Sequence, residues 1–189
     1  SLDWRVAGRA ADGLWRRLLG AMGVMLGAPS ETALAAFDEK GALIHALSIG
    51  RFGAADVDAA MAQDFLGPAA QPGKEARSGG VTWRPVAAPS RDRFIFNELK
   101  QDGPEGAFAV YFSYWIKIPR ALDDLLTAGP DAPRVTTLCY VSEKCALFVN
   151  GEALTPARTE AADYRTLYVF DGLPLKQGWN HCLIKAVAN

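Results

Sequence analysis

Six aromatic rings in strand-like segments are the side chains of this chain best suited to holding a ligand. A flat ring offers an apolar face to a sugar ring, and a neighbouring polar group fixes the orientation of the sugar. The six rings are Trp83, Tyr111, Trp115, Tyr140, Tyr164 and Tyr168. Two of them lie next to a predicted loop and beside an arginine, which is a common partner for a sugar hydroxyl or a uronate. We therefore predict Trp83, Arg84, Tyr164 and Arg165 as the ligand-binding residues.

Core packing is the competing interpretation for each of these rings. Alternation along the strand predicted for Phe108 to Ile118 places Tyr111, Ser113 and Trp115 on one face and the even-numbered residues from 112 to 116 on the other. One of the two faces must belong to the core. Both faces are aromatic, so the sequence leaves the assignment open.

No catalytic motif is visible in the sequence. Ser113 and Ser142 lie in no GxSxG nucleophile elbow, and His45 and His181 both fall inside apolar strand-like runs. There is no P-loop and no GxGxxG motif. We therefore predict an accessory module rather than an enzyme.

A structural calcium ion is the only cofactor that we consider. Calcium needs a cluster of oxygen ligands, and Asp92, Asp102 and Asp163 are candidate donors. Their spacing does not single out a binding loop, so the calcium site stays unassigned and no other cofactor is expected.

The bulk composition excludes two classes of partner. The chain has 189 residues, half of them hydrophobic, and a formal net charge of −1. There is no basic excess that would indicate a nucleic-acid partner. The uninterrupted apolar run is about half of the ~20 residues that a membrane span needs. We therefore predict neither nucleic acid nor a membrane as a partner.

The three cysteines form no CxxC pair and no cluster with histidine that would indicate zinc. They are Cys139, Cys145 and Cys182, and all of them lie in apolar strand-like runs. Buried free thiols are therefore predicted. A bridge between Cys139 and Cys145 is the alternative, if the turn between them sets the two side chains opposite each other.

The segment from Phe108 to Ile118 is rich in aromatic and β-branched residues, which favour a buried strand. Further strands are predicted at Val135 to Val141 and Ala146 to Val149, and Asn150-Gly151 is a strong hairpin signal. About eight or nine strands follow residue 42 at spacings typical of an all-β sandwich. We therefore predict a mostly β, antiparallel sandwich over residues 42–189, with the segment at 108–118 as an interior strand.

Residues 1–41 differ from the rest of the chain. Leu14, Leu18 and Met22 recur at helical spacing after Asp12, a suitable N-cap, so a helix is predicted over 13–27 and a second, short one over Glu31 to Phe37. This N-terminal helical segment is expected to pack on the sandwich. Alternatively, the basic pair and apolar run at 16–28 fit a secretory signal peptide.

The last predicted strand, Trp179 to Val187, is apolar on both faces. Such a strand is usually covered on both sides, and the sandwich core covers only one. The other cover is either the N-terminal helix or a further domain, and we expect Leu183 and Val187 to contact the helix at Leu14 to Met25.

Several segments together resemble the galactose-binding-like jelly-roll modules attached to bacterial polysaccharide-degrading enzymes. These are LSIGRF at 47–52, VTW at 81–83, AVYFSYWIKIP at 109–119, CYVSEKCALFVNGEAL at 139–154 and LPLKQGWNHCLIKAV at 173–187. The sequence departs from such modules at Ser142-Glu143-Lys144, where two acidic residues are usual, and at Phe148, a position often held by tryptophan.

The resemblance implies a jelly-roll sandwich and a non-catalytic carbohydrate-binding module of a larger polysaccharide-degrading enzyme. The expected partners are a polysaccharide or oligosaccharide and a neighbouring catalytic domain, and the expected location is secreted or on the cell surface. The alternative is a structural module of the same fold that braces a catalytic domain without binding sugar, since an architecture does not fix a ligand.

Overall fold

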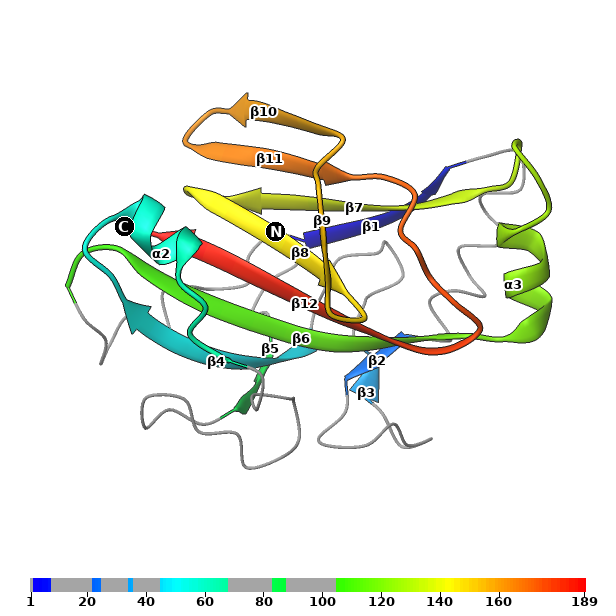
Figure 1. Cartoon of the computed structure of the whole chain (residues 1–189), viewed down its shortest axis with the longest axis horizontal. Helices are drawn as coiled ribbons and strands as arrows, with labels where there is room; N and C mark the ends of the chain where they lie inside the picture. Colours follow the sequence, from blue (N-terminus) through cyan, green and yellow to red (C-terminus); the bar gives the residue numbers. More distant parts are fainter. Residues whose placement is uncertain (1, 8–21, 25–33, 36–44, 68–82, 88–104) are drawn as a thin grey trace.

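A computed structural model describes residues 2–7, 22–24, 34–35, 45–67, 83–87 and 105–189, which form two antiparallel sheets and two short helices (Figure 1). Sheet A consists, in spatial order, of β1 (Leu2–Ala7), β7 (Arg134–Val141), β11 (Arg165–Phe170) and β10 (Arg158–Ala162). The main path of sheet B is β3 (Leu34–Ala35), β2 (Met22–Val24), β6 (Phe108–Ile118), β12 (Gly178–Ala188), β8 (Lys144–Val149) and β9 (Glu152–Leu154). Sheet B also contains β4 (His45–Gly53), which pairs with β6 and with β5 (Arg84–Ala87). The helices are α2 (Val57–Ala62) and α3 (Arg120–Leu126).

Strand β6 lies in the interior of sheet B, as predicted from its aromatic and β-branched content. It pairs with β12 along its whole length, from Phe108 opposite Ala188 to Ile118 opposite Gly178. Its other edge is shared, because β4 pairs with its first half and β2 pairs near Trp115. The mostly β, antiparallel architecture is thereby confirmed.

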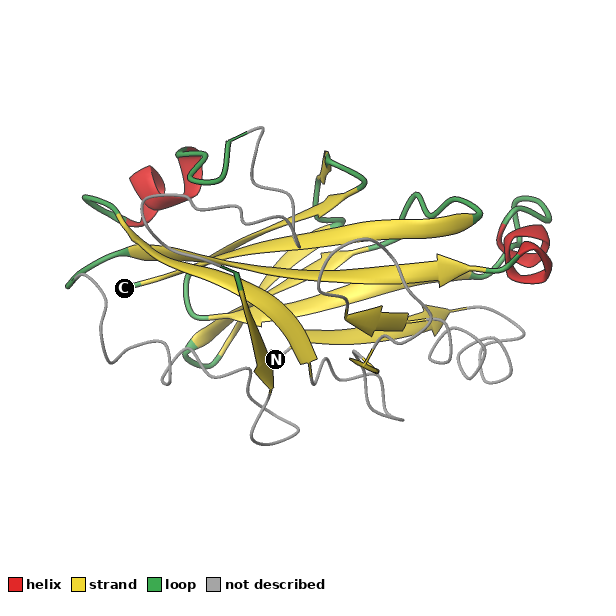
Figure 2. Ribbon diagram, turned by 90° about the horizontal axis from the view of Figure 1, so that it is seen from below, coloured by secondary structure: helices red, strands yellow, loops and turns green. Residues whose placement is uncertain are grey.

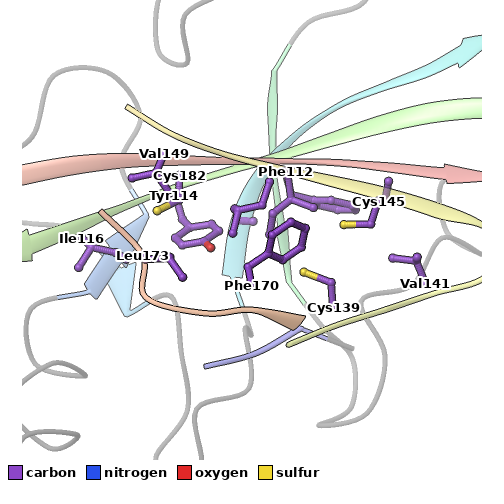
Figure 3. Close-up of a cluster of buried hydrophobic side chains, with 14 of the residues drawn as sticks. Phe112, Tyr114, Ile116, Cys139, Val141, Cys145, Val149, Phe170, Leu173 and Cys182 are labelled. Carbon is purple, nitrogen blue, oxygen red and sulfur yellow. The ribbon is translucent and has the colours of Figure 1, made fainter. Parts of the chain in front are cut away.

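The hydrophobic core lies between the two sheets, and the even-numbered residues of β6 point into it (Figure 3). This settles which face of β6 is core: Phe112, Tyr114 and Ile116 are each at most 2% exposed. They meet β7 and β11 of sheet A, where Phe170 is 1% exposed. The odd-numbered face, with Tyr111, Ser113 and Trp115, is therefore the outer face of sheet B.

The three cysteines belong to this core as buried free thiols, which confirms the prediction. Cys139 comes from β7, Cys145 from β8 and Cys182 from β12, and no bridge joins Cys139 to Cys145 (Figure 3). Burial raises the pKa of the Cys182 thiol well above its usual range. A protonated thiol in an apolar interior packs as a small hydrophobic side chain.

Where residues 1–41 are described, they form strands, and the predicted N-terminal helical segment is wrong for those positions. Met22–Val24 pairs with β6, Leu34–Ala35 pairs with Met22–Val24, and Leu2–Ala7 pairs with β7. The remainder of both predicted helices lies outside the described residues. A short apolar run fits a helix or a buried strand equally well. Here the second half of β6 is not paired with β4, and its backbone groups need hydrogen-bonding partners, which favours a strand at Met22–Val24.

The Asn150-Gly151 turn joins β8 to β9 as the sequence predicts. Asn150 has a φ of +51° and Gly151 a φ of +86°, the left-handed conformation that both central residues of a tight hairpin turn adopt. The side chain of Asn150 makes two hydrogen bonds to β12. Its Nδ2 donates to Asn180 Oδ1 at 2.9 Å, and its Oδ1 accepts from His181 N at 3.0 Å. The hairpin turn is thus fixed to the start of β12.

The outer face of sheet B is covered near the end of β12 by α2 and the residues that follow it, up to Leu66. Figure 2 shows α2 outside the layer of strands, at the opposite end of the molecule from α3. Val187 is fully buried and Leu183 half-buried in this outer cluster. Both faces of β12 are therefore covered there, but the described cover is α2. The predicted contact with Leu14 to Met25 is untested, because Met22–Val24 is described only as a strand paired with β6 and the other residues of that segment lie outside the described ranges.

Candidate ligand-binding site

A pocket of about 510 Å³ lies on the outer face of sheet B beside α2, and we call it the outer-face pocket. Its base comes from β6, β12 and β8, and its wall is the end of α2 with the loop that follows. The lining residues are Met61, Ala62, Gln63, Asp64, Leu66, Gly67, Tyr111, Ala146, Phe148, Gly151, His181, Leu183 and Lys185. This volume falls within the range of about 300–1,000 Å³ that is usual for small-molecule sites.

Strand alternation sets the base of the pocket. His181, Leu183 and Lys185 are two residues apart on β12, so all three side chains point to the same face. The register places Leu183 opposite Phe148 of β8, and Lys185 opposite Tyr111 of β6. The base is therefore apolar in the middle and polar at its two ends.

Lys185 holds the wall of the pocket in place. Its Nζ donates to the carbonyl oxygen of Met61, in the last turn of α2, at 2.7 Å and to that of the C-cap residue Gln63 at 2.6 Å. The same Nζ lies 5.4 Å from the centre of the Phe65 ring. The residue is only 4% exposed, and desolvation lowers the pKa of its ammonium group. An ammonium group at the C-terminus of a helix satisfies carbonyls that the helix itself leaves unpaired.

The rim of the pocket carries hydrogen-bonding groups on the loop after α2. Asp64 and Gln63 are both exposed. The Oδ1 atom of Asp64 accepts from the backbone N–H of Leu66 at 3.0 Å and of Gly67 at 3.2 Å, which fixes the carboxylate relative to the loop. Burial raises the pKa of Tyr111 to about 12, so its hydroxyl is protonated at neutral pH, and it accepts a long bond from Phe65 N.

At the other end of the pocket, His181 lies against Ser113 and Trp115. The Nε2 atom of His181 is 2.8 Å from Ser113 Oγ, and its ring centre is 4.8 Å from that of Trp115. A serine beside a histidine is the first requirement of a nucleophilic site. Ser113 is only 1% exposed, however, so its hydroxyl orients the imidazole ring and does not reach a substrate.

Acid should unfold the protein partly through His181. Burial lowers the pKa of His181 to about 4 from its ordinary 6.5, so the folded state binds a proton less readily than the unfolded chain. The neutral, buried His181 therefore contributes to the free energy of unfolding, and this contribution is complete above pH 6.5. It is lost as the pH falls towards 4, and the total loss is about 2–3 kcal/mol. Urea denaturation at pH 7.0, 5.5 and 4.5 measures the loss.

The matched variant for this prediction is His181→Gln. It should be less stable at pH 7.0 but should lose less stability between pH 7.0 and 4.5 than the parent protein. Equal acid losses in the two proteins would show that other groups cause the transition.

The predicted ligand-binding residues fall at two places, both different from the outer-face pocket. Tyr164 is 71% exposed at the turn between β10 and β11, with the Arg165 guanidinium 4.8 Å above its ring centre and bonded to its hydroxyl at 2.9 Å. Trp83 is half-buried against the core clusters, and its buried Nε1 has no hydrogen-bond partner among the described residues. Arg84 is exposed at the start of β5. Tyr164 and Arg165 are thus in contact at the edge of sheet A, whereas Trp83 and Arg84 lie at the start of β5 in sheet B.

Metal ligands do not gather in the part of the chain that the structure describes: no group of three or more histidine, cysteine or acidic side chains occurs there. Asp163 lies in the β10–β11 turn with a φ of +54°, and Asp92 and Asp102 lie outside the described residues. In the same described ranges, no helix is long and apolar enough to cross a membrane.

The sequence did not identify the outer-face pocket, because its residues come from four separate elements. One signal was present: Lys185 lies between Ile184 and Ala186 in a strand covered on both faces. A charged residue is rarely buried without a partner, so a lysine at such a position marks a polar contact within the outer cover.

Comparisons of the chain with protein-family models, with curated proteins and with solved structures find no match.

Proposed function

We propose that this chain is a non-catalytic carbohydrate-binding module and that the sugar occupies the outer-face pocket. One observation carries this proposal: the pocket combines an apolar base with a polar rim. The base is formed by Leu183 and Phe148. Gln63 and Asp64 supply an amide and a carboxylate at the rim, and His181 supplies an imidazole ring at one end.

This combination suits a pyranose ring better than a fully apolar or a highly charged ligand. One face of a sugar ring presents C–H groups that pack against Phe148 and Leu183. The hydroxyl groups around its edge need donors and acceptors, which the amide of Gln63 and the carboxylate of Asp64 offer. A sheet base built from three adjacent strands also keeps these groups in a fixed arrangement.

The resemblance described above supports the same function. Segments of the sequence resemble galactose-binding-like jelly-roll modules, and the antiparallel sheets are consistent with a β-sandwich. On this basis we propose a bacterial, secreted or cell-surface enzyme of polysaccharide degradation as the parent protein, with a neighbouring catalytic domain. If no sugar binds, the alternative is a structural module that braces the catalytic domain.

Isothermal titration with soluble oligosaccharides of several backbone types tests the proposal directly. We expect dissociation constants in the micromolar to millimolar range for at least one of them. Phe148→Ala should weaken that binding about tenfold or more, because the ring supplies the apolar contact. A circular dichroism spectrum and a thermal melt of the variant show that it remains folded.

Tyr164→Ala is the matched control, since it removes an exposed aromatic ring on the other sheet. It should leave the affinity unchanged if the sugar binds in the outer-face pocket. Loss of binding in Tyr164→Ala with normal binding in Phe148→Ala would transfer the site to the β10–β11 turn. Absence of binding to every oligosaccharide would contradict the proposed function.

A further inference from the structure

We propose that the outer-face pocket selects neutral glycans and rejects acidic ones, with Asp64 accepting hydrogen bonds from the hydroxyl groups of the sugar. The inference rests on the proposed function and names the class of ligand. Its basis is the set of charges that the pocket presents, and which of them a ligand can reach.

The cation in the pocket is already engaged. Lys185 is 4% exposed, and its Nζ is held by the carbonyl oxygens of Met61 and Gln63. A uronate would have to take Nζ away from these carbonyls and leave them unsatisfied at the end of α2. Recognition of a carboxylate usually relies on an accessible arginine or lysine, and the described residues that line the pocket include no arginine.

His181 does not supply a positive charge either. Its Nε2 is 2.8 Å from Ser113 Oγ and its ring lies against Trp115, so the imidazole is enclosed on two sides. Burial lowers the pKa of His181 to about 4, and the ring is therefore neutral at physiological pH. A neutral imidazole bonds to hydroxyl groups and adds no attraction for an anion.

Among the described residues that line the pocket, the accessible charge is instead the carboxylate of Asp64. Its Oδ1 bonds to two backbone N–H groups of the loop, which holds the group at the rim. A carboxylate is an acceptor-only group with several lone-pair directions, so it can accept from two neighbouring hydroxyls of one sugar. The same charge repels a carboxylate on the ligand, and the repulsion is greater in a pocket with apolar walls than in open water.

Pairs of oligosaccharides that differ only in carrying a hydroxymethyl or a carboxylate group at C6 test this selectivity. We would titrate the protein with α-1,4-linked galactotriose and trigalacturonate, and with glucose and glucuronate oligomers of matched linkage, in low salt at pH 7. The expected result is at least tenfold tighter binding of the neutral member of whichever pair binds. Tighter or equal binding of the acidic member would overturn the inference while leaving the proposed function intact.

Asp64→Asn tests the role of this residue, since Asn keeps an oxygen for the N–H groups of Leu66 and Gly67 and removes the charge. The variant should bind the neutral ligand about three- to tenfold more weakly and should bind the acidic ligand more tightly than the parent protein does. Asp163→Asn, the same change at an exposed turn of sheet A, should alter neither affinity. If Asp64→Asn left both affinities unchanged, the assignment of Asp64 would be wrong, and if no glycan bound the parent protein, the proposed function itself would fail.

Discussion

Asn180→Ala is expected to lower the free energy of unfolding by about 3–5 kcal/mol. Asn180 is fully buried, and its amide joins two turns. Its Nδ2 donates to the carbonyl of Lys176 at 2.7 Å, and its Oδ1 accepts from Lys176 N and from Asn150 Nδ2, both at 2.9 Å. Alanine would leave several partly buried polar groups without their partner at once, and each costs about 1–3 kcal/mol.

Chemical denaturation of the parent protein and of Asn180→Ala measures this loss. Gln177→Ala is the control, because Gln177 is exposed in the same turn, and it should change stability by less than about 0.5 kcal/mol. A loss below about 1 kcal/mol for Asn180→Ala would mean that the turn before β12 does not depend on this amide.

Lys185→Met is expected to destabilise the protein by about 3–4 kcal/mol. Methionine preserves much of the length and volume of the side chain but cannot donate to Met61 O and Gln63 O, which lie 2.7 and 2.6 Å from Nζ. Hydrogen bonds from charged donors contribute about 1.5–3 kcal/mol each. The end of α2 should therefore loosen, and amide hydrogen exchange should accelerate in Val57–Ala62 before it does in β6.

Lys117→Met provides the comparison for this experiment. Lys117 lies on the outward face of β6, as Lys185 lies on the outward face of the neighbouring strand β12. Lys117 is exposed, however, and its Nζ lies 5.6 Å from the centre of the Trp179 ring. Its replacement should leave both the stability and the exchange of α2 close to those of the parent protein. Equal effects of the two substitutions would show that Lys185 acts through its general charge and not through its bonds to α2.

The sequence predicted the central strands because the residue types there favour one backbone conformation strongly. The aromatic and β-branched run at 108–118 and the Asn150-Gly151 turn are of this kind. Local signals failed at Met22–Val24, where an apolar triplet pairs with the second half of β6. The choice between helix and strand there depends on an unfilled strand edge distant in sequence, which no local pattern reveals.

The candidate site was less predictable for a related reason. The approach of His181 to Ser113 depends on the register of β12 against β6, in which Trp115 is opposite His181. A register shift of one residue would turn each of these side chains to the other face. The sequence gives the alternation within each strand but not the alignment between strands, so the residues that form the pocket could not be grouped before the structure was known.

The pairing of β1 with β7 has a consequence for how the chain acquires its fold. Residues 2–7 hydrogen-bond to residues 134–141, so sheet A includes a contact of very high sequence separation, whereas β10, β11 and the β8–β9 hairpin close locally. Contacts of this kind require loop-closure entropy to be lost before any stabilisation is gained, and they slow folding to the range of milliseconds to seconds. During synthesis, β1 must wait until β7 has left the ribosome. We therefore expect the β1–β7 pairing to form late, and the edge of β7 to stay open to strand exchange with another copy of the chain until it does.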